Sequence, residues 1–193
     1  MENYKKNLEL LTKNHVYSEE MEHDACGVGL IASTEGKKSR AIVEYGIEAL
    51  KAVWHRGAVD ADGKTGDGAG IHVEIPKDFF IEKIQVTGHD YDNSEICVGM
   101  IFLPRNDYSA QESCKTIVES ELTKNNFSIY GWRQVPVNPK VLGQKALQTM
   151  PEIIQVLFKS NDNNLLEKNL ERKIYETRKK IENKAFQLSL NNF

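Results

Sequence analysis

The feature that most constrains this sequence is a stretch rich in glycine and aspartate, RGAVDADGKTGDGAG, at residues 56–70. Both residue types are frequent in tight turns and are disfavoured inside helices and strands. The stretch therefore predicts a loop. Apolar residues with helical spacing precede it, with Ser39 as a candidate N-cap and Gly57 as a stop signal, and alternating apolar residues follow it.

This loop resembles two kinds of ligand site, and its spacing disfavours both. A calcium-binding EF-hand loop that began at Asp60 would need glycine and glutamate where Thr65 and Ile71 stand, and Lys64 would replace a ligand. A phosphate-binding P-loop needs its lysine after the glycines, whereas Lys64 precedes them. Considered alone, the stretch is best interpreted as a tight loop before a strand.

The rest of the chain alternates between predicted strands and helices. Strands are expected at residues 26–33, 71–76, 95–104, 127–138, 150–160 and 185–190, and helices at 39–55, 77–84, 109–125 and 165–185. Ser109 is a candidate cap for the third helix. This order fits either a parallel sheet or a layered α+β fold, and periodicity does not separate the two. A strand that begins so near the end of the sequence suggests a fragment of a longer protein.

Composition excludes several classes of protein. The chain has 193 residues, 40% hydrophobic and 27% charged, with a net charge of -3. A nucleic-acid-binding protein would show a basic patch, and a membrane helix needs about 20 apolar residues in a row; the sequence has neither. The first 25 residues contain no apolar signal-peptide core. We therefore expect a cytoplasmic protein, with a plastid as the alternative location.

The three cysteines, Cys26, Cys97 and Cys114, are too few and too widely spaced to predict a disulfide framework. No C-x-x-C pair is present, so a metal site in this segment is not expected. Cys97 and Cys114 lie in apolar segments and are interpreted as small core residues. Cys26 differs, because it stands between a polar leader and the first apolar run.

Two roles for Cys26 remain open on chemical grounds. A structural thiol is the commoner role for a lone cysteine. Alternatively, cleavage before Cys26 would give it a free α-amino group, whose pKa of about 8 leaves it partly neutral near physiological pH. That amine then accepts the thiol proton, so one residue supplies both nucleophile and base.

Three segments together favour the second role: ACGVGLIA at 25–32, HRGAVDADGKTGDGAGI at 55–71 and IPKDFF at 75–80. In order and spacing they resemble the class II glutamine amidotransferase domain of the glutamate synthase large subunits, a family of N-terminal nucleophile (Ntn) hydrolases. Other class II amidotransferases share the shorter HRG pattern. Another amidotransferase and a non-catalytic relic that binds a partner therefore remain the alternatives.

The resemblance implies an α+β fold, a four-layer αββα sandwich that is incomplete at its C-terminal end. Residues 1–25 would be a propeptide and 26–193 the first part of the glutaminase domain. Cys26 would release ammonia from L-glutamine through a thioester, and the ammonia would form glutamate from 2-oxoglutarate in the rest of the large subunit. That part would hold FMN and a 3Fe-4S cluster and could pair with a small NADPH-oxidising subunit; this segment would hold no cofactor.

The resemblance also implies supporting roles near the nucleophile. Arg56 would orient Cys26, or instead pair with Asp60, Asp62 or Asp67 to hold the loop. Gly27 and Gly57 would allow close backbone approach. The family's oxyanion and substrate-binding motifs, of the form HNGEINT and RFSTNT, do not occur in this sequence. We therefore expect the 193-residue chain to be inactive alone, because one lost oxyanion donor costs about 10²–10³ in rate.

Overall fold

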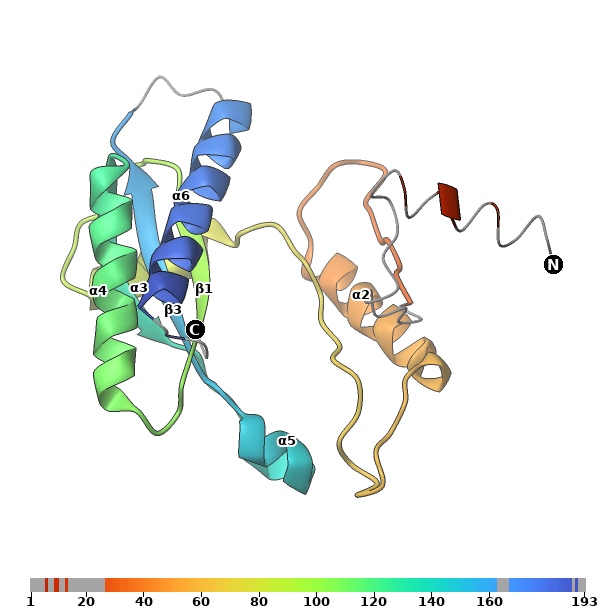
Figure 1. The fold of residues 1–193 in the computed structure, drawn as a ribbon. Helices are drawn as coiled ribbons and strands as arrows, with labels where there is room; N and C mark the ends of the chain where they lie inside the picture. The colour runs from red at the N-terminus through yellow and green to blue at the C-terminus, as the bar shows by residue number, and fades with distance from the viewer. Residues whose placement is uncertain are drawn as a thin grey trace. The chain divides into compact units, whose positions relative to one another are not determined.

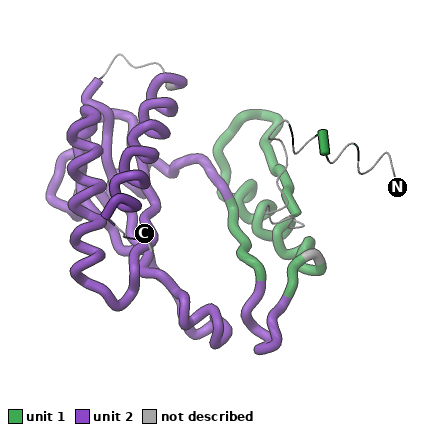
Figure 2. Tube along the Cα trace, viewed as in Figure 1, with its two compact units in different colours: residues 1–58, 67–71 green, residues 59–66, 72–193 purple. Residues whose placement is uncertain are grey.

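The computed structural model describes residues 27–162, 167–188 and 190, together with Lys6, Glu9, Leu10 and Lys13. By their internal contacts the residues divide into two compact units (Figure 2). The first unit comprises residues 1–58 and 67–71, and the second comprises 59–66 and 72–193. The predicted boundary between a leader and the domain, at residues 25 and 26, lies outside the described residues and stays a prediction.

The first unit contains the predicted helix after the opening segment. Helix α2 spans Arg40–Ala52, and the Ser39 hydroxyl accepts a hydrogen bond from the Ala41 N–H at 3.2 Å. The predicted N-cap is therefore confirmed. The final turn of the predicted helix is instead the short 3₁₀ helix η1, Trp54–Arg56.

Two predicted strands are absent from the described structure. Residues 27–33 and 71–76 are irregular, and the side chains of Val28 and Leu30 are 95% and 89% exposed. The apolar pattern predicts a strand because it marks surface that can be buried. A strand also needs another strand to pair with, and no described strand pairs with either segment.

The second unit is built on a three-stranded sheet. Strands β1 (Cys97–Leu103), β2 (Phe127–Gln134) and β3 (Glu152–Ser160) lie in the order β1-β3-β2, and both pairings are antiparallel. Val156 lies opposite Gly99 on one side and opposite Trp132 on the other. The three central strand predictions are confirmed. The antiparallel pairing is consistent with α+β and excludes an all-parallel sheet for this unit.

Helices cover this sheet on both faces (Figure 1). Helices α4 (Tyr108–Lys124) and α6 (Glu167–Gln187) pack against each other and against one face, where Val156 and Phe158 are buried. Helix α3 (Lys77–Val86) packs on the other face against Leu157. The alternation along β3 explains this arrangement, since successive side chains of a strand point to opposite faces. The described residues hold one sheet, so the second sheet of the predicted sandwich is not seen.

The start of α4 differs from its prediction. Asp107, not Ser109, is the N-cap, and its carboxylate accepts a hydrogen bond from the Ala110 N–H at 2.9 Å. Ser109 lies inside the first turn, and its carbonyl accepts a hydrogen bond from the Ser113 hydroxyl. Aspartate and serine cap helices about equally well, so the sequence alone does not choose between them.

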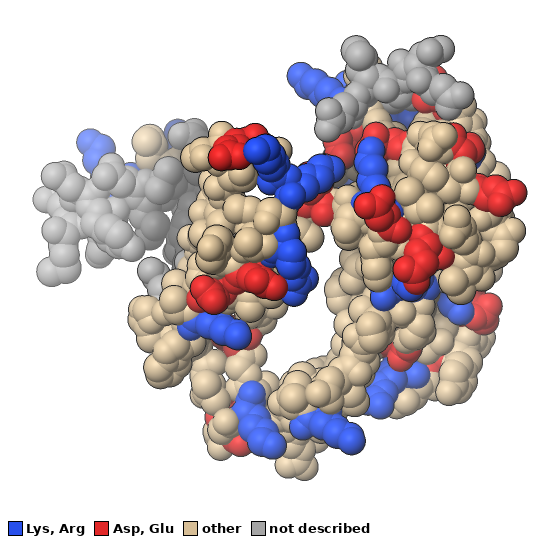
Figure 3. Space-filling view, turned by 180° about the vertical axis from the view of Figure 1, so that it is seen from behind, with Lys and Arg blue, Asp and Glu red and all other residues tan. Residues whose placement is uncertain are grey.

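The strand predicted at residues 185–190 is wrong, because Ala185 to Gln187 continue α6. Ala185 is buried beside Ile181 in the core, and this four-residue spacing is helical. The outer side of α6 carries ion pairs that join Arg172 to Glu176 and Arg178 to Glu182. Positive and negative side chains are interspersed on the face shown in Figure 3.

Two short elements were not predicted: η2 (Pro139–Val141) and α5 (Gln144–Thr149), which lie between β2 and β3. Both occur in a segment without a clear apolar period. Among the described residues, no helix combines the length and the apolar character that crossing a membrane requires.

Candidate functional site

The predicted nucleophile, Cys26, lies outside the described residues. The continuous described segment begins at Gly27, which is exposed, and continues without regular structure to a turn at Thr34 and Glu35. In that turn the Gly36 N–H donates to the Ser33 carbonyl at 3.2 Å. The predicted roles of Cys26 and Gly27 therefore stay predictions.

The HRG segment, residues 55–57, comprises the last two residues of η1 and Gly57. The Gly57 N–H donates to the Trp54 carbonyl at 3.0 Å, which closes the turn. A Cβ atom at Gly57 would lie 3.4 Å from that carbonyl oxygen, an ordinary contact, so this turn does not itself require glycine. The side chain of Arg56 is outside the described residues, and its role also stays a prediction.

The glycine- and aspartate-rich stretch is a closed loop, as predicted, and its base is hydrogen-bonded. The Ala58 N–H donates to the Asp67 carboxylate at 2.8 Å, and the Asp67 N–H donates back to the Ala58 carbonyl at 3.3 Å. One step further in, Val59 and Gly66 form an antiparallel bridge. At the tip, Gly63 adopts a φ of 67°, which glycine tolerates best.

Asp62 organises the inside of this loop. Its carboxylate accepts hydrogen bonds from the backbone N–H groups of Lys64 at 2.9 Å and Thr65 at 2.7 Å, and from the Thr65 hydroxyl at 2.6 Å. These bonds, led by the one from the Thr65 hydroxyl, hold the pKa of Asp62 well below its usual range. Asp62 is therefore ionised at neutral pH.

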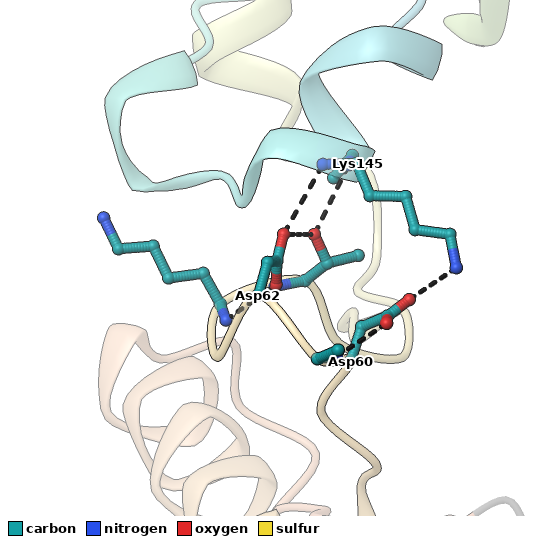
Figure 4. Close-up of polar contacts among 7 residues, drawn as sticks. Asp60, Asp62 and Lys145 are labelled. Carbon is teal, nitrogen blue, oxygen red and sulfur yellow. Dashed lines mark hydrogen bonds and ion pairs between the residues drawn. The ribbon is translucent and has the colours of Figure 1, made fainter.

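The loop also contacts α5, within the second unit (Figure 4). The Lys145 ammonium lies 2.5 Å from the Asp60 carboxylate. This ion pair raises the pKa of Lys145 and, together with a hydrogen bond from the Ala61 N–H, lowers that of Asp60. This contact could not be predicted from the sequence, because its partners lie 85 residues apart and the sequence does not predict α5.

The three loop aspartates named as alternative partners of Arg56 each have a described contact, and the role of Arg56 stays a prediction. Asp60 pairs with Lys145, Asp62 accepts hydrogen bonds from Lys64 and Thr65, and Asp67 accepts one from the Ala58 N–H. Each aspartate thus has a structural partner other than Arg56, and the loop has bonds of its own that close it.

The remaining cysteines do not form a ligand set. Cys97 and Cys114 are buried in different core clusters, one with Val156 and the other with Leu103. No group of three or more His, Cys, Asp or Glu side chains among the described residues is placed to hold a metal ion.

Comparison with known proteins decides the family. Residues 26–192 match the sequence profile described as class-II glutamine amidotransferases. The chain belongs to this family. The matched range begins at Cys26, the residue predicted to become the N-terminal nucleophile, and it includes the HRG segment and the closed loop.

Several relatives of this amidotransferase chain are much longer proteins. It is 49% identical over 190 residues to the glutamate synthase [NADPH] large chain of Azospirillum brasilense, which covers 98% of this chain and 12% of that relative. It is 41% identical over 174 residues to the ferredoxin-dependent glutamate synthase of Pyropia yezoensis, covering 90% and 11%. A chloroplastic/mitochondrial ferredoxin-dependent glutamate synthase of Arabidopsis thaliana is 39% identical over 162 residues. The chain thus spans about an eighth of the length of its first relative.

Proposed function

We propose that this chain is the nucleophile-bearing part of the glutaminase domain of a glutamate synthase. The observation that carries the proposal is the family match that starts at Cys26, joined to 49% identity with a glutamate synthase large chain along almost the whole sequence. The substrate of this domain is L-glutamine, and its product is ammonia for glutamate formation from 2-oxoglutarate.

In the proposed reaction, removal of residues 1–25 frees the α-amino group of Cys26. This amine accepts the thiol proton, and the thiolate attacks the side-chain amide carbon of glutamine. The tetrahedral intermediate collapses to a thioester as protonated nitrogen leaves as ammonia. Water then adds to the thioester carbonyl, glutamate departs and the thiol is restored, so that no external oxidant or reductant is needed.

Three further residues have proposed roles close to Cys26. Arg56 would act as a positioning residue, because its planar guanidinium offers several fixed donors to the nucleophile or its surroundings. Gly27 and Gly57 would let the backbone approach the substrate closely. The loop at residues 58–67 is proposed as a scaffold, which its internal hydrogen bonds support.

The whole protein, as we propose it, extends well past this segment. The rest of the large chain would supply the oxyanion donors, the site for the glutamine carboxylate and the second sheet of an αββα sandwich. FMN and a 3Fe-4S cluster would be held there, where the imine formed from ammonia and 2-oxoglutarate is reduced, and a small NADPH-oxidising subunit would be a partner. We propose a cytoplasmic or plastid location, since chloroplastic enzymes are among the relatives.

The test is a pair of matched cysteine variants in the complete large chain. Cys26→Ser should abolish glutamine-dependent glutamate formation and leave ammonia-dependent formation intact, because ammonia bypasses the glutaminase site. Cys114→Ala, which removes a buried thiol with no proposed role in this chemistry, should retain both activities. Glutamine-dependent activity in Cys26→Ser equal to that of the parent would overturn the proposal.

A further inference from the structure

From β1 onward, the second unit follows the chain order β1-α4-β2-β3-α6, apart from the short elements η2 and α5 between β2 and β3. Because β1 and β2 are each antiparallel to β3, which lies between them, they are parallel to each other. Helix α4 connects these two parallel strands across one face of the sheet (Figure 1). This is the split β-α-β pattern, whose complete form has a second crossover helix and a fourth strand.

Strand β1 has an open edge. Among the described strands it pairs with β3 alone, in a register that is continuous from Cys97 to Leu103. Its sequence, CVGMIFL, contains no charged residue and no proline, and no bulge interrupts it. Charges, prolines and bulges are the usual means by which proteins prevent an edge strand from pairing further. The β1 edge is therefore suited to receive another strand.

The opposite edge of the sheet, on β2, is obstructed. A bulge shifts the register of β2 between Ile129 and Gly131. The Thr87 hydroxyl, which directly follows α3, lies 2.7 Å from the Tyr130 carbonyl oxygen, and a Cβ atom at Gly131 would lie 2.7 Å from the Thr87 methyl carbon. A bulge and a covering segment both hinder strand pairing at an edge. A further strand thus fits beside β1 better than beside β2.

The hand of the crossover connections favours the same edge. Helices α4 and α6 cover the same face of the sheet. If a strand after α6 lay beside β1 and parallel to β3, its connection from β3 would have the same hand as the connection from β1 to β2. Beside β2, it would have the opposite hand. Since about 98% of such crossovers are right-handed, both connections obey the rule only when the new strand lies beside β1.

The residue described after α6 lies at the correct end of β1. The Leu190 N–H donates to the Ala185 carbonyl at 3.0 Å, and the Leu190 side chain packs against a core cluster that includes Leu103 and Ile154. Leu103 is the last residue of β1. A strand that began near this cluster would run from the end of β1 toward its beginning, which is the antiparallel direction that the pattern requires.

We infer that the β1 edge docks the segment of the large chain that follows residue 193, and that this segment adds a fourth strand antiparallel to β1. The sheet order would then be fourth strand-β1-β3-β2. The occupant is the same chain, because this sequence spans 12% of its first relative and α6 leads the chain to β1. The inference rests on the proposed function only for this continuation of the chain.

Hydrogen–deuterium exchange of the complete large chain tests the pairing without a substitution. A strand that is paired on one side leaves about half of its amides free to exchange, because alternate N–H groups point away from the partner. We expect peptides that cover β1 to be protected throughout, like those that cover β3, which has a partner on each side. Fast exchange at about half of the β1 amides would overturn the inference.

A photo-cross-linker on β1 identifies the occupant. Phe102 is 50% exposed, so benzoylphenylalanine can replace it in the complete large chain. A residue directly opposite on an added strand would have its Cβ about 4.5–5.5 Å away, within reach of this group. We expect an intramolecular cross-link to the first strand after residue 193. The same group at Tyr175, which is 55% exposed on α6, is the control and should not cross-link to that strand.

The remaining outcomes of this experiment contradict the inference. A cross-link from position 102 to a second copy, a cross-link to any other part of the chain, or no cross-link would each overturn it. These results are separate from those of the Cys26→Ser assay, which reports on glutamine hydrolysis. An unpaired β1 in a protein that responds to Cys26→Ser as proposed would overturn the inference alone, and the reverse combination would overturn the proposed function alone.

Discussion

At the scale of single residues, the cysteines differ in what surrounds them. Cys97 is buried on β1, and its burial, with a smaller contribution from the charges of Glu95 and Glu171, raises the pKa of its thiol to about 12. Burial also raises the pKa of Cys114. Neither thiol forms an appreciable amount of thiolate at neutral pH, so neither has the reactivity of a nucleophile. The sequence predicted their core positions correctly from the apolar segments that contain them.

This difference predicts selective labelling of the native protein. Brief treatment with iodoacetamide at neutral pH should modify Cys26 and leave Cys97 and Cys114 largely unmodified, and peptide mass spectrometry measures each site. All three should react after denaturation, which is the control for reagent access. Modification of Cys97 as fast as Cys26 in the native protein would contradict the account.

Asp92 shows how a residue with no proposed catalytic role contributes to stability. Its carboxylate pairs with the Lys159 ammonium and accepts hydrogen bonds from the Tyr130 hydroxyl at 2.8 Å and the Ser94 N–H at 3.3 Å. The Lys159 contact is the largest cause of a pKa held well below the usual range of an aspartate. The folded state therefore binds this proton less readily than the unfolded state does.

A pH dependence follows from that sign. The stabilisation by Asp92 is complete above the unfolded pKa of about 4 and is lost as the pH falls below it. Asp92→Asn should lower stability at pH 7, and the difference from the parent should shrink steadily between pH 5 and pH 2. Thermal unfolding measured across this range checks it. A difference as large at pH 2 as at pH 7 would show that charge is not the cause.

At the scale of secondary structure, β3 holds the second unit together. It is the central strand, and its side chains reach the α4 and α6 face at Val156 and the α3 face at Leu157. The sequence predicted this strand, its two neighbours and the helices α2, α3, α4 and α6, because each shows an apolar pattern along its length. It failed for α5, which is too short to show a period, and for residues 27–33, where burial depends on a partner.

Removing the side chain of one residue at the centre of β3 should therefore destabilise the second unit strongly. Leu157→Ala should lower the free energy of unfolding by about 2–5 kcal/mol, because Leu157 is fully buried and its loss leaves a cavity. Met100→Ala is the matched control, since Met100 lies on the neighbouring strand and is 47% exposed, and it should cost far less. Urea unfolding measures both. Equal losses would contradict the assigned core.

At the scale of the whole molecule, the family follows from the sequence motifs, whereas contacts between distant residues follow only from the structure. The family could be predicted from motifs alone, because ACGVGLIA and HRGAVDADGKTGDGAGI have a specific order and spacing, and the comparison confirms it. The contact of the loop at residues 59–66 with α5 could not be predicted, since nothing local in Asp62 or Thr65 points to a partner more than 80 residues away. Such pairings are set by the fold and not by neighbouring residues.

The separated chain provides a prediction at this scale. The 193 residues contain neither motif expected to supply the oxyanion donors and the carboxylate site, so the isolated chain should show no glutaminase turnover above background. A coupled assay of ammonia release measures this, with the complete large chain as the positive control. Turnover by the isolated chain close to that of the complete protein would show that the motifs are not needed.

The central claim is that Cys26 becomes the N-terminal residue and attacks glutamine. Its most direct test is mass spectrometry of the complete large chain after treatment with an electrophilic glutamine analogue. The account predicts that residues 1–25 are absent and that one adduct lies on Cys26, prevented by excess glutamine. Retention of residues 1–25 in active protein, or an adduct on another residue, would contradict it.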